Sequence, residues 1–187
     1  MPDKNDNPEI NGQKQSKVGY LVSIMGLLLW LLLPAPVQAQ YAYTTNNGAI
    51  KITQYTGSGG VVTIPGTING LPVTSIGDDA FSDCTNLTSV TIPNSVTTIE
   101  GWAFNDCTKL TSINIPSRVT SIGDSAFYGC TKLTSITIPS SVTSIGDSAF
   151  AGCTSLAAIT VDSMNLNYCS FDGVLFNKSQ TTLHGLH

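Results

Sequence analysis

Cysteines are the residues of this sequence best suited to chemistry, and four of the five follow one spacing. Cys84, Cys107, Cys130 and Cys153 lie 23 residues apart, and Cys169 lies outside that series. Disulfides and thiolate zinc sites both need side chains that converge. Residues that recur at the same place in stacked coils instead form a row, about 4.8 Å apart, with parallel side chains. We therefore expect four buried free thiols, while Cys169 could be a reactive thiol or an intermolecular disulfide partner.

The histidines do not complete a catalytic constellation. They are His184 and His187, both in the last four residues of the sequence. A Ser–His–Asp or Cys–His site needs a base that the fold holds in place, and so little chain remains there that we do not expect one. The sequence also contains no phosphate-binding glycine loop and no calcium loop. We predict no catalytic, cofactor-binding or metal-binding residue, and no enzyme activity.

Aspartates recur at matching positions, which argues against a catalytic role. Asp78, Asp124 and Asp147 share one place in a repeated pattern, whereas a catalytic carboxylate is expected only once. Aspartate commonly accepts hydrogen bonds from nearby backbone in turns. We interpret these residues as turn formers, with Glu100 taking their role in one copy of the pattern.

The elements that must position all these residues are repeats of nearly equal length. Apolar residues recur in register, including an isoleucine, a phenylalanine and a leucine in every copy. One copy cannot enclose its own apolar side chains, so the copies must stack and share one continuous core. The sequence therefore predicts a repeat solenoid. Its four full copies are residues 73–95, 96–118, 119–141 and 142–163.

Each copy has its own predicted local structure. Residues 87–92 alternate so that Val90 and Ile92 point inward, which indicates a short half-buried strand. Pro93 ends this strand because proline cannot continue a ladder of backbone hydrogen bonds. A second extended piece follows, for example at residues 96–99. The spacing of the apolar residues after it indicates a single helical turn.

The pattern V-x-x-I-x-x-x-A-F-x-x-C-x-x-L-x-x-V/I-x-I-P resembles the BspA-like leucine-rich repeats of bacterial surface and secreted proteins. The match covers residues 73–163. The resemblance implies a right-handed leucine-rich-repeat coil with short parallel strands, single helical turns and β-hairpin-like flanks. It also implies a secreted or surface-exposed protein that binds a protein or cell-surface ligand and mediates adhesion. The alternative is a structural spacer of an envelope or matrix without a dedicated ligand.

The flanks of the repeats also resemble this family. Asn46-Asn-Gly-Ala-Ile50 and Val61-Val-Thr-Ile-Pro65 are similar to its N-terminal segment, so residues 40–72 are expected to form a β cap. Asp172-Gly-Val-Leu-Phe176 is similar to a hairpin insert that normally leads into further repeats. Residues 164–187 are therefore expected to be either a partial hairpin insert of a truncated chain or a C-terminal cap.

Two surfaces are candidates for ligand binding. The first is the outward side of the main strands, where small polar side chains form straight rows. The second is an aromatic pair, which could be a binding hot spot or could simply pack over adjacent coils. The residues of the first surface are Ser89, Thr91, Ser112, Asn114, Ser135, Thr137 and Thr160, and those of the second are Trp102 and Tyr128.

The N-terminal residues have the features of an export signal. Residues 18–33 are an apolar run, preceded by lysines and followed by small residues. The run is shorter than the roughly 20 residues that span a bilayer, which favours a cleaved signal peptide over an uncleaved anchor. We predict a signal peptide at residues 1–39, with a mature chain that begins at Gln40 and does not span the membrane. Mass spectrometry of exported protein that retained Met1 would contradict this.

Composition narrows the class of partner. Charged residues make up 11% of the sequence and hydrophobic residues 41%, so serine, threonine, asparagine and glycine provide most of the polarity. This composition is typical of extracellular proteins. The net charge is −4, and the repeats contain no basic cluster that could contact phosphate backbones. We therefore expect no nucleic-acid partner and a secreted or cell-surface protein.

Overall fold

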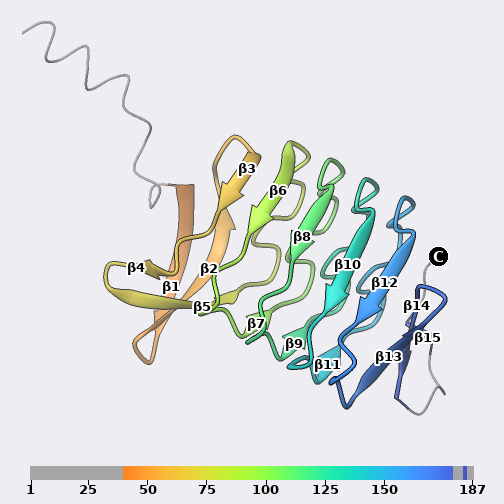
Figure 1. Cartoon of the computed structure of the whole chain (residues 1–187). Coiled ribbons are helices and arrows are strands. Elements are labelled where there is room, and N and C mark those ends of the chain that lie inside the picture. The colour runs from red at the N-terminus through yellow and green to blue at the C-terminus, as the bar shows by residue number, and fades with distance from the viewer. Residues whose placement is uncertain (1–39, 179–182, 185–187) are drawn as a thin grey trace, which may run out of the picture. The chain divides into compact units, whose positions relative to one another are not determined.

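The structure is a computed structural model that describes residues 40–178 and 183–184. Residues 40–178 wind into a solenoid in which the strands of successive coils lie side by side (Figure 1). The predicted repeat solenoid with short parallel strands is thus confirmed. The strands in the described residues are β1 (Tyr41–Asn46), β2 (Ala49–Tyr55), β3 (Gly60–Thr63), β4 (Thr67–Ile68), β5 (Leu71–Ile76), β6 (Leu87–Thr91), β7 (Thr98–Ile99), β8 (Ser112–Asn114), β9 (Ser121–Ile122), β10 (Ser135–Ile138), β11 (Ser144–Ile145), β12 (Ala158–Val161), β13 (Tyr168–Phe171), β14 (Val174–Asn177) and β15 (Leu183–His184).

The first side of each coil carries its main strand. Strands β3, β6 and β8 pair in parallel, as do β10 and β12. Val90 pairs with Ile113, and both side chains are buried. The residues on either side of them point outward, as the alternation of apolar and polar residues predicts.

The second side of each coil carries a strand of only a few residues. Strands β5, β7, β9 and β11 pair in parallel, and Ile76, Ile99 and Ile122 lie in one register. All three isoleucines are buried. The extended piece that the sequence predicts at residues 96–99 therefore includes a true strand, β7.

The third side of each coil corrects the sequence-based expectation, because the predicted helical turn is replaced by consecutive tight turns. The structure contains no α-helix in the residues it describes. Trp102 and Asp106 have left-handed backbone, with φ of 54° and 51°, and such residues interrupt a right-handed helix. Backbone N–H groups then donate to the next coil. Trp102 N–H donates to Asp124 O at 2.9 Å, and Phe104 N–H to Ala126 O at 2.8 Å. Spacing alone could not distinguish these turns from a helical one.

Stacked aromatic rings run through the core of the solenoid. Phe81, Phe104, Phe127 and Phe150 are almost completely buried, and successive rings lie 5.0, 5.3 and 5.6 Å apart between centroids. Tyr55 extends this stack into the first coil, with its ring 5.0 Å from that of Phe81. The repeats therefore share one continuous apolar core, as the period of 23 predicts.

Antiparallel hairpins flank the repeats at both ends, which agrees with the predicted hairpin-like flanks. Strand β1 pairs with β2, and β4 pairs with β5. At the other end, β13 pairs with β14. The chain between β12 and β13 is joined to the last coil by Asn165, a fully buried polar residue. Its Nδ2 donates to Pro139 O at 2.8 Å and to Val142 O at 3.0 Å.

The predicted signal peptide and cleavage site lie outside the described residues, and so does His187. Between residue 40 and residue 184, the described segments contain no helix that is long and apolar enough to cross a membrane.

Candidate binding surfaces

The small polar residues of the first candidate surface lie on the outward side of the main strands. Ser89 pairs with Ser112, and Thr91 with Asn114. Thr137 pairs with Thr160 in the same way further along the solenoid. All seven residues of this surface are exposed except Ser89, which is partly buried. We call these seven residues the sheet face.

The sheet face is divided between β8 and β10. These two strands belong to separate hydrogen-bonded sheets, although they follow one another in the solenoid (Figure 1). Just before these strands, Thr134 donates two long hydrogen bonds to Thr111 O, from its N–H and from its Oγ1, both at 3.4 Å. A ligand that covers the sheet face must therefore bridge two short sheets rather than lie along one continuous ladder.

The second candidate surface is the aromatic pair on the turn side of the coils. Trp102 is 44% exposed and Tyr128 is 41% exposed. Their ring centroids lie 5.9 Å apart, with the ring planes inclined at 50°. The two rings therefore contact each other and still present much of their surface to solvent.

Two of the repeated aspartates act on the following coil rather than on their own turn. Asp78 Oδ1 accepts a hydrogen bond from Gly101 N–H at 2.9 Å, and Asp124 Oδ1 accepts one from Asp147 N–H at 2.8 Å. Each of these acceptors lies 23 residues before its donor. The prediction that these aspartates accept hydrogen bonds from backbone N–H groups is correct, but each bond joins two coils instead of closing a turn within one coil.

Glu100 does not take the place of these aspartates. Gly101, not Glu100, lies 23 residues after Asp78. The Glu100 carboxylate instead accepts hydrogen bonds from Lys51 Nζ at 2.8 Å and Ser75 Oγ at 2.7 Å. Partial burial alone would raise its pKa, but these two hydrogen bonds and the charge of Lys51 hold the pKa of Glu100 below its ordinary value. Glu100 thus ties the second repeat to the N-terminal strands.

The cysteine row consists of free thiols, as expected. Cys107, Cys130 and Cys153 are buried, and each thiol donates to the carbonyl oxygen of a phenylalanine in the preceding coil at 3.0–3.2 Å. Hydrogen bonding between neighbouring thiols, together with burial, raises the pKa of Cys130 and of Cys153 well above the ordinary value. Protonated, enclosed thiols are poor nucleophiles.

Cys84 departs from the expected burial because the first coil is shorter on its turn side. Ile52 pairs with Ile76 but Val62 pairs with Val90, so nine residues separate the two paired positions in the first coil and thirteen separate them in the next. The short loop leaves Cys84 only partly covered. Burial, and to a lesser degree the charge of Asp83, still raises the pKa of the Cys84 thiol.

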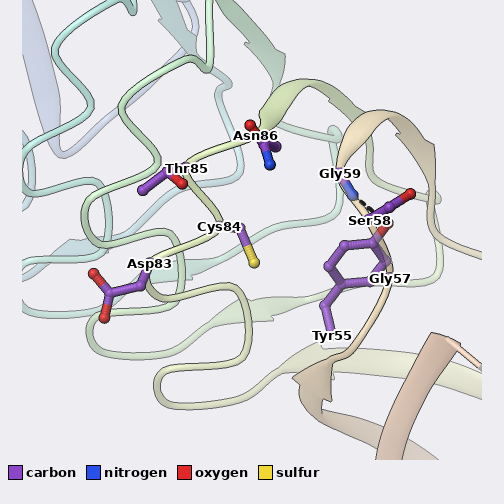
Figure 2. Close-up of a pocket in the computed structure, with 8 residues that line it drawn as sticks. All are labelled: Tyr55, Gly57, Ser58, Gly59, Asp83, Cys84, Thr85 and Asn86. Carbon is purple, nitrogen blue, oxygen red and sulfur yellow. Dashed lines mark hydrogen bonds between the residues drawn. The ribbon is translucent and has the colours of Figure 1, made fainter.

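The shorter first coil also leaves a small pocket, of about 160 Å³, beside Cys84. Figure 2 shows the Cys84 thiol directed towards the loop that follows Tyr55, and Gly59 N–H donates to the Tyr55 hydroxyl at 3.3 Å. Pockets for small molecules usually measure roughly 300–1,000 Å³, so we assign no ligand to it. It is lined by Tyr55, Gly57, Ser58, Gly59, Asp83, Cys84, Thr85 and Asn86.

Thiol titration with Ellman's reagent should separate the cysteines into two classes. In the native protein we expect Cys84 and Cys169, which are partly exposed, to react, while the three buried thiols do not. In denaturant without reductant, all five thiols should react. Thiols that appear only after reduction would show disulfides and contradict the parallel row. A variant with Cys84→Ser and Cys169→Ser should show no native reaction.

The remaining candidates for chemistry do not assemble into a site. Cys169 lies in β13, and its thiol is 3.7 Å from Asn177 O. His184 falls in β15, but its side chain is not among those described. Among the residues that the structure describes, no three histidine, cysteine or acidic side chains are grouped as metal ligands would be.

Comparison with known proteins agrees with this architecture. Residues 62–181 match the model of a family described as BspA type leucine rich repeat region, in six copies. A leucine rich repeat protein from T. pallidum is 29% identical, with a TM-score of 0.55, over 67% of this chain and 70% of that one. A leucine-rich repeat protein from Bacteroides capillosus is 27% identical, with a TM-score of 0.57, over 66% of this chain and 95% of that one. A search of curated proteins found no match.

Proposed function

Because the chain belongs to the BspA type leucine-rich repeat family, we propose that it is an exported protein that binds other proteins through its sheet face. Stacked repeats place the same small polar side chains on successive strands, and this arrangement suits contact with an extended ligand surface. The observation that carries the proposal is the register of these rows, in which Ser89 pairs with Ser112 and Thr137 with Thr160.

The composition of the sheet face predicts how it binds. Strands β6, β8, β10 and β12 contain no charged residue. Their outward hydroxyl and amide groups offer many weak hydrogen bonds, so affinity should accumulate over several coils rather than at one hot spot. Binding should depend little on salt, because few ion pairs are available to be screened.

Export and adhesion complete the proposal. The apolar run at residues 18–33 and the small residues before Gln40 support a cleaved signal peptide and a secreted or cell-surface location. At that location, the protein would attach to a protein ligand on a host or neighbouring cell. Saturable binding to such cells would support this role, whereas its absence would favour a structural spacer.

A double variant, Thr91→Lys with Thr137→Lys, should abolish most of this binding. Both residues are exposed, and each lies on a different half of the divided sheet face. Two bulky charges there block close approach without touching the core. The free energy of unfolding should change by less than about 1 kcal/mol, since exposed substitutions away from special features cost little. Cell-binding assays and urea melts measure the two effects.

The matched control places the same charges beside the second set of strands. Thr120→Lys with Thr143→Lys alters two exposed residues next to β9 and β11. This control should keep full binding and lose only two threonine hydrogen bonds between coils, each 3.2 Å long. Normal binding by the Thr91/Thr137 variant would show that the ligand contacts another surface.

A further inference from the structure

A second binding surface, with different chemistry, lies around Trp102 and Tyr128 on the turn side of the coils. These two residues break the repeat. The positions that correspond to Trp102 in the other coils hold Asp79, Ser125 and Ser148. All four have left-handed backbone, with φ between 52° and 56°.

The left-handed backbone at this position does not require a tryptophan. Short polar residues such as aspartate and serine enter the left-handed region more readily than a bulky aromatic residue does. Tyr128 likewise stands where other coils have Ser82, Asn105 and Ala151. Trp102 therefore costs backbone energy, and the pair leaves two rings more than two-fifths exposed, although the other coils fold with smaller residues at these positions.

Three aspartates lie next to Trp102 and Tyr128 in the stack of coils. Asp78 Oδ1 accepts a hydrogen bond from Gly101, the residue before Trp102. Asp124 lies beside Trp102 on the next coil, where its backbone carbonyl oxygen accepts the Trp102 N–H at 2.9 Å. Asp106 lies beside Tyr128, and its backbone N–H donates to the Tyr128 backbone carbonyl oxygen at 2.8 Å.

These carboxylates are not neutralised from within the fold. In the described residues, the single ion pair joins Lys51 and Glu100, at 2.8 Å. The side chains of Asp78 and Asp124 are exposed, and that of Asp106 is partly exposed. Three aspartates without an ion-pair partner among the described residues therefore lie near the aromatic pair, and a basic ligand could compensate their charge.

From the exposed rings and the charge around them, we propose that this surface binds basic segments of other proteins. An arginine or lysine side chain lies over the faces of Trp102 and Tyr128, where the π electrons attract a cation. Neighbouring basic residues of the ligand pair with Asp78, Asp106 and Asp124. Arginine fits best, because its planar guanidinium stacks on aromatic rings and binds a carboxylate with two hydrogen bonds. This site is independent of the sheet face.

Fluorescence of Trp102 offers a direct test in the full chain. Trp30 and Trp102 are the two tryptophans, so a Trp30→Phe background leaves Trp102 as the sole reporter. Octa-arginine should quench or shift its emission in a saturable manner, whereas octa-glutamate and a neutral β-glucan oligosaccharide should not. Raising sodium chloride from about 20 to 200 mM should weaken octa-arginine binding at least fivefold, because the screening length of exposed charges falls from about 20 Å to below about 10 Å.

Variants measured by anisotropy of labelled octa-arginine locate the site. Trp102→Ser restores the residue type found at this position in later coils, and it should weaken binding about two- to fivefold. A triple variant, Asp78→Asn with Asp106→Asn and Asp124→Asn, keeps an acceptor oxygen at each position but removes the charges. It should weaken binding about tenfold. The matched control, Asp162→Asn, removes one charge at an exposed turn after β12 and should have little effect.

Three results would overturn the proposal. Unchanged octa-arginine binding by both Trp102→Ser and the triple variant would show that the peptide binds elsewhere. Equal binding of the neutral oligosaccharide, insensitive to salt, would identify a sugar site instead. No fluorescence change at low salt would show that the surface does not accept cations. None of these results bears on the sheet face, because Thr91→Lys with Thr137→Lys tests that face separately.

Discussion

Phe127→Ala should lower the free energy of unfolding by about 3–5 kcal/mol, the usual cost of removing a fully buried phenylalanine ring. Phe127 is completely buried. Its ring stacks on Phe104 at 5.3 Å and on Phe150 at 5.6 Å, with the planes within 7° of parallel. The cavity cannot collapse easily, because both neighbouring rings are held by their own coils. Urea denaturation followed by circular dichroism measures the loss.

The adjacent residue provides the control for Phe127. Tyr128 is exposed and contacts Trp102, so Tyr128→Ala should cost no more than about 1 kcal/mol. If Phe127→Ala also cost less than about 1 kcal/mol, the continuous aromatic stack would not be the main source of stability. A comparable loss at the two positions would mean that the core and the turn surface contribute alike.

The sequence predicted the core and the strands because both follow from a period of apolar residues. Buried positions such as Phe127 and Val90 recur every 23 residues. A strand can be recognised within one repeat, because its apolar and polar residues alternate. The sheet-face residues could be assigned to the outward side for the same reason. The cysteine row was predictable as free thiols, since a fixed period places side chains in parallel.

The turn side was less predictable, because its structure depends on backbone angles and contacts between coils. Apolar spacing around Phe104 fits a helical turn and a series of tight turns equally well. A tryptophan does not predict the left-handed backbone that Trp102 adopts. Asp79 and Ser125, at the same position of other coils, are residue types that adopt it more readily. The partial exposure of Cys84 depends on the short first coil, which only the pairing of Val62 with Val90 reveals.

Asn165 is the residue that sequence reasoning missed most clearly. It lies outside the repeats, so no period marks it, and asparagine is usually a surface residue. The structure buries it completely. Besides its two donated bonds to the last coil, its Oδ1 accepts from Asn167 N–H and Tyr168 N–H, both at 2.8 Å. One amide thus joins the C-terminal hairpin to the last coil.

Asn165→Ala should lower the free energy of unfolding by about 2–4 kcal/mol, because it removes hydrogen bonds to buried backbone groups. Val142 and Tyr168 are buried, so the bonds that Asn165 makes to Val142 O and Tyr168 N–H would be lost in a place that water reaches poorly. Each such group costs about 1–3 kcal/mol. Pro139 and Asn167 are less covered and can be rehydrated. Thermal and urea melts measure the loss, with the exposed neighbour Asn167→Ala as the control, expected within about 0.5 kcal/mol.

Asn165→Asp distinguishes the hydrogen bonds of this residue from its packing. Aspartate keeps the shape and the oxygen that accepts from Tyr168, but at neutral pH it turns a second carboxylate oxygen towards Pro139 O and Val142 O. Folding therefore favours the protonated carboxyl, which can still donate to one carbonyl, and the pKa of this group is raised in the folded state. With a raised pKa, the variant gains stability relative to wild type as pH falls from about 7 to about 4. A difference that is constant across this range would mean that Asn165 contributes through packing alone, and that its amide does not hold the hairpin to the last coil.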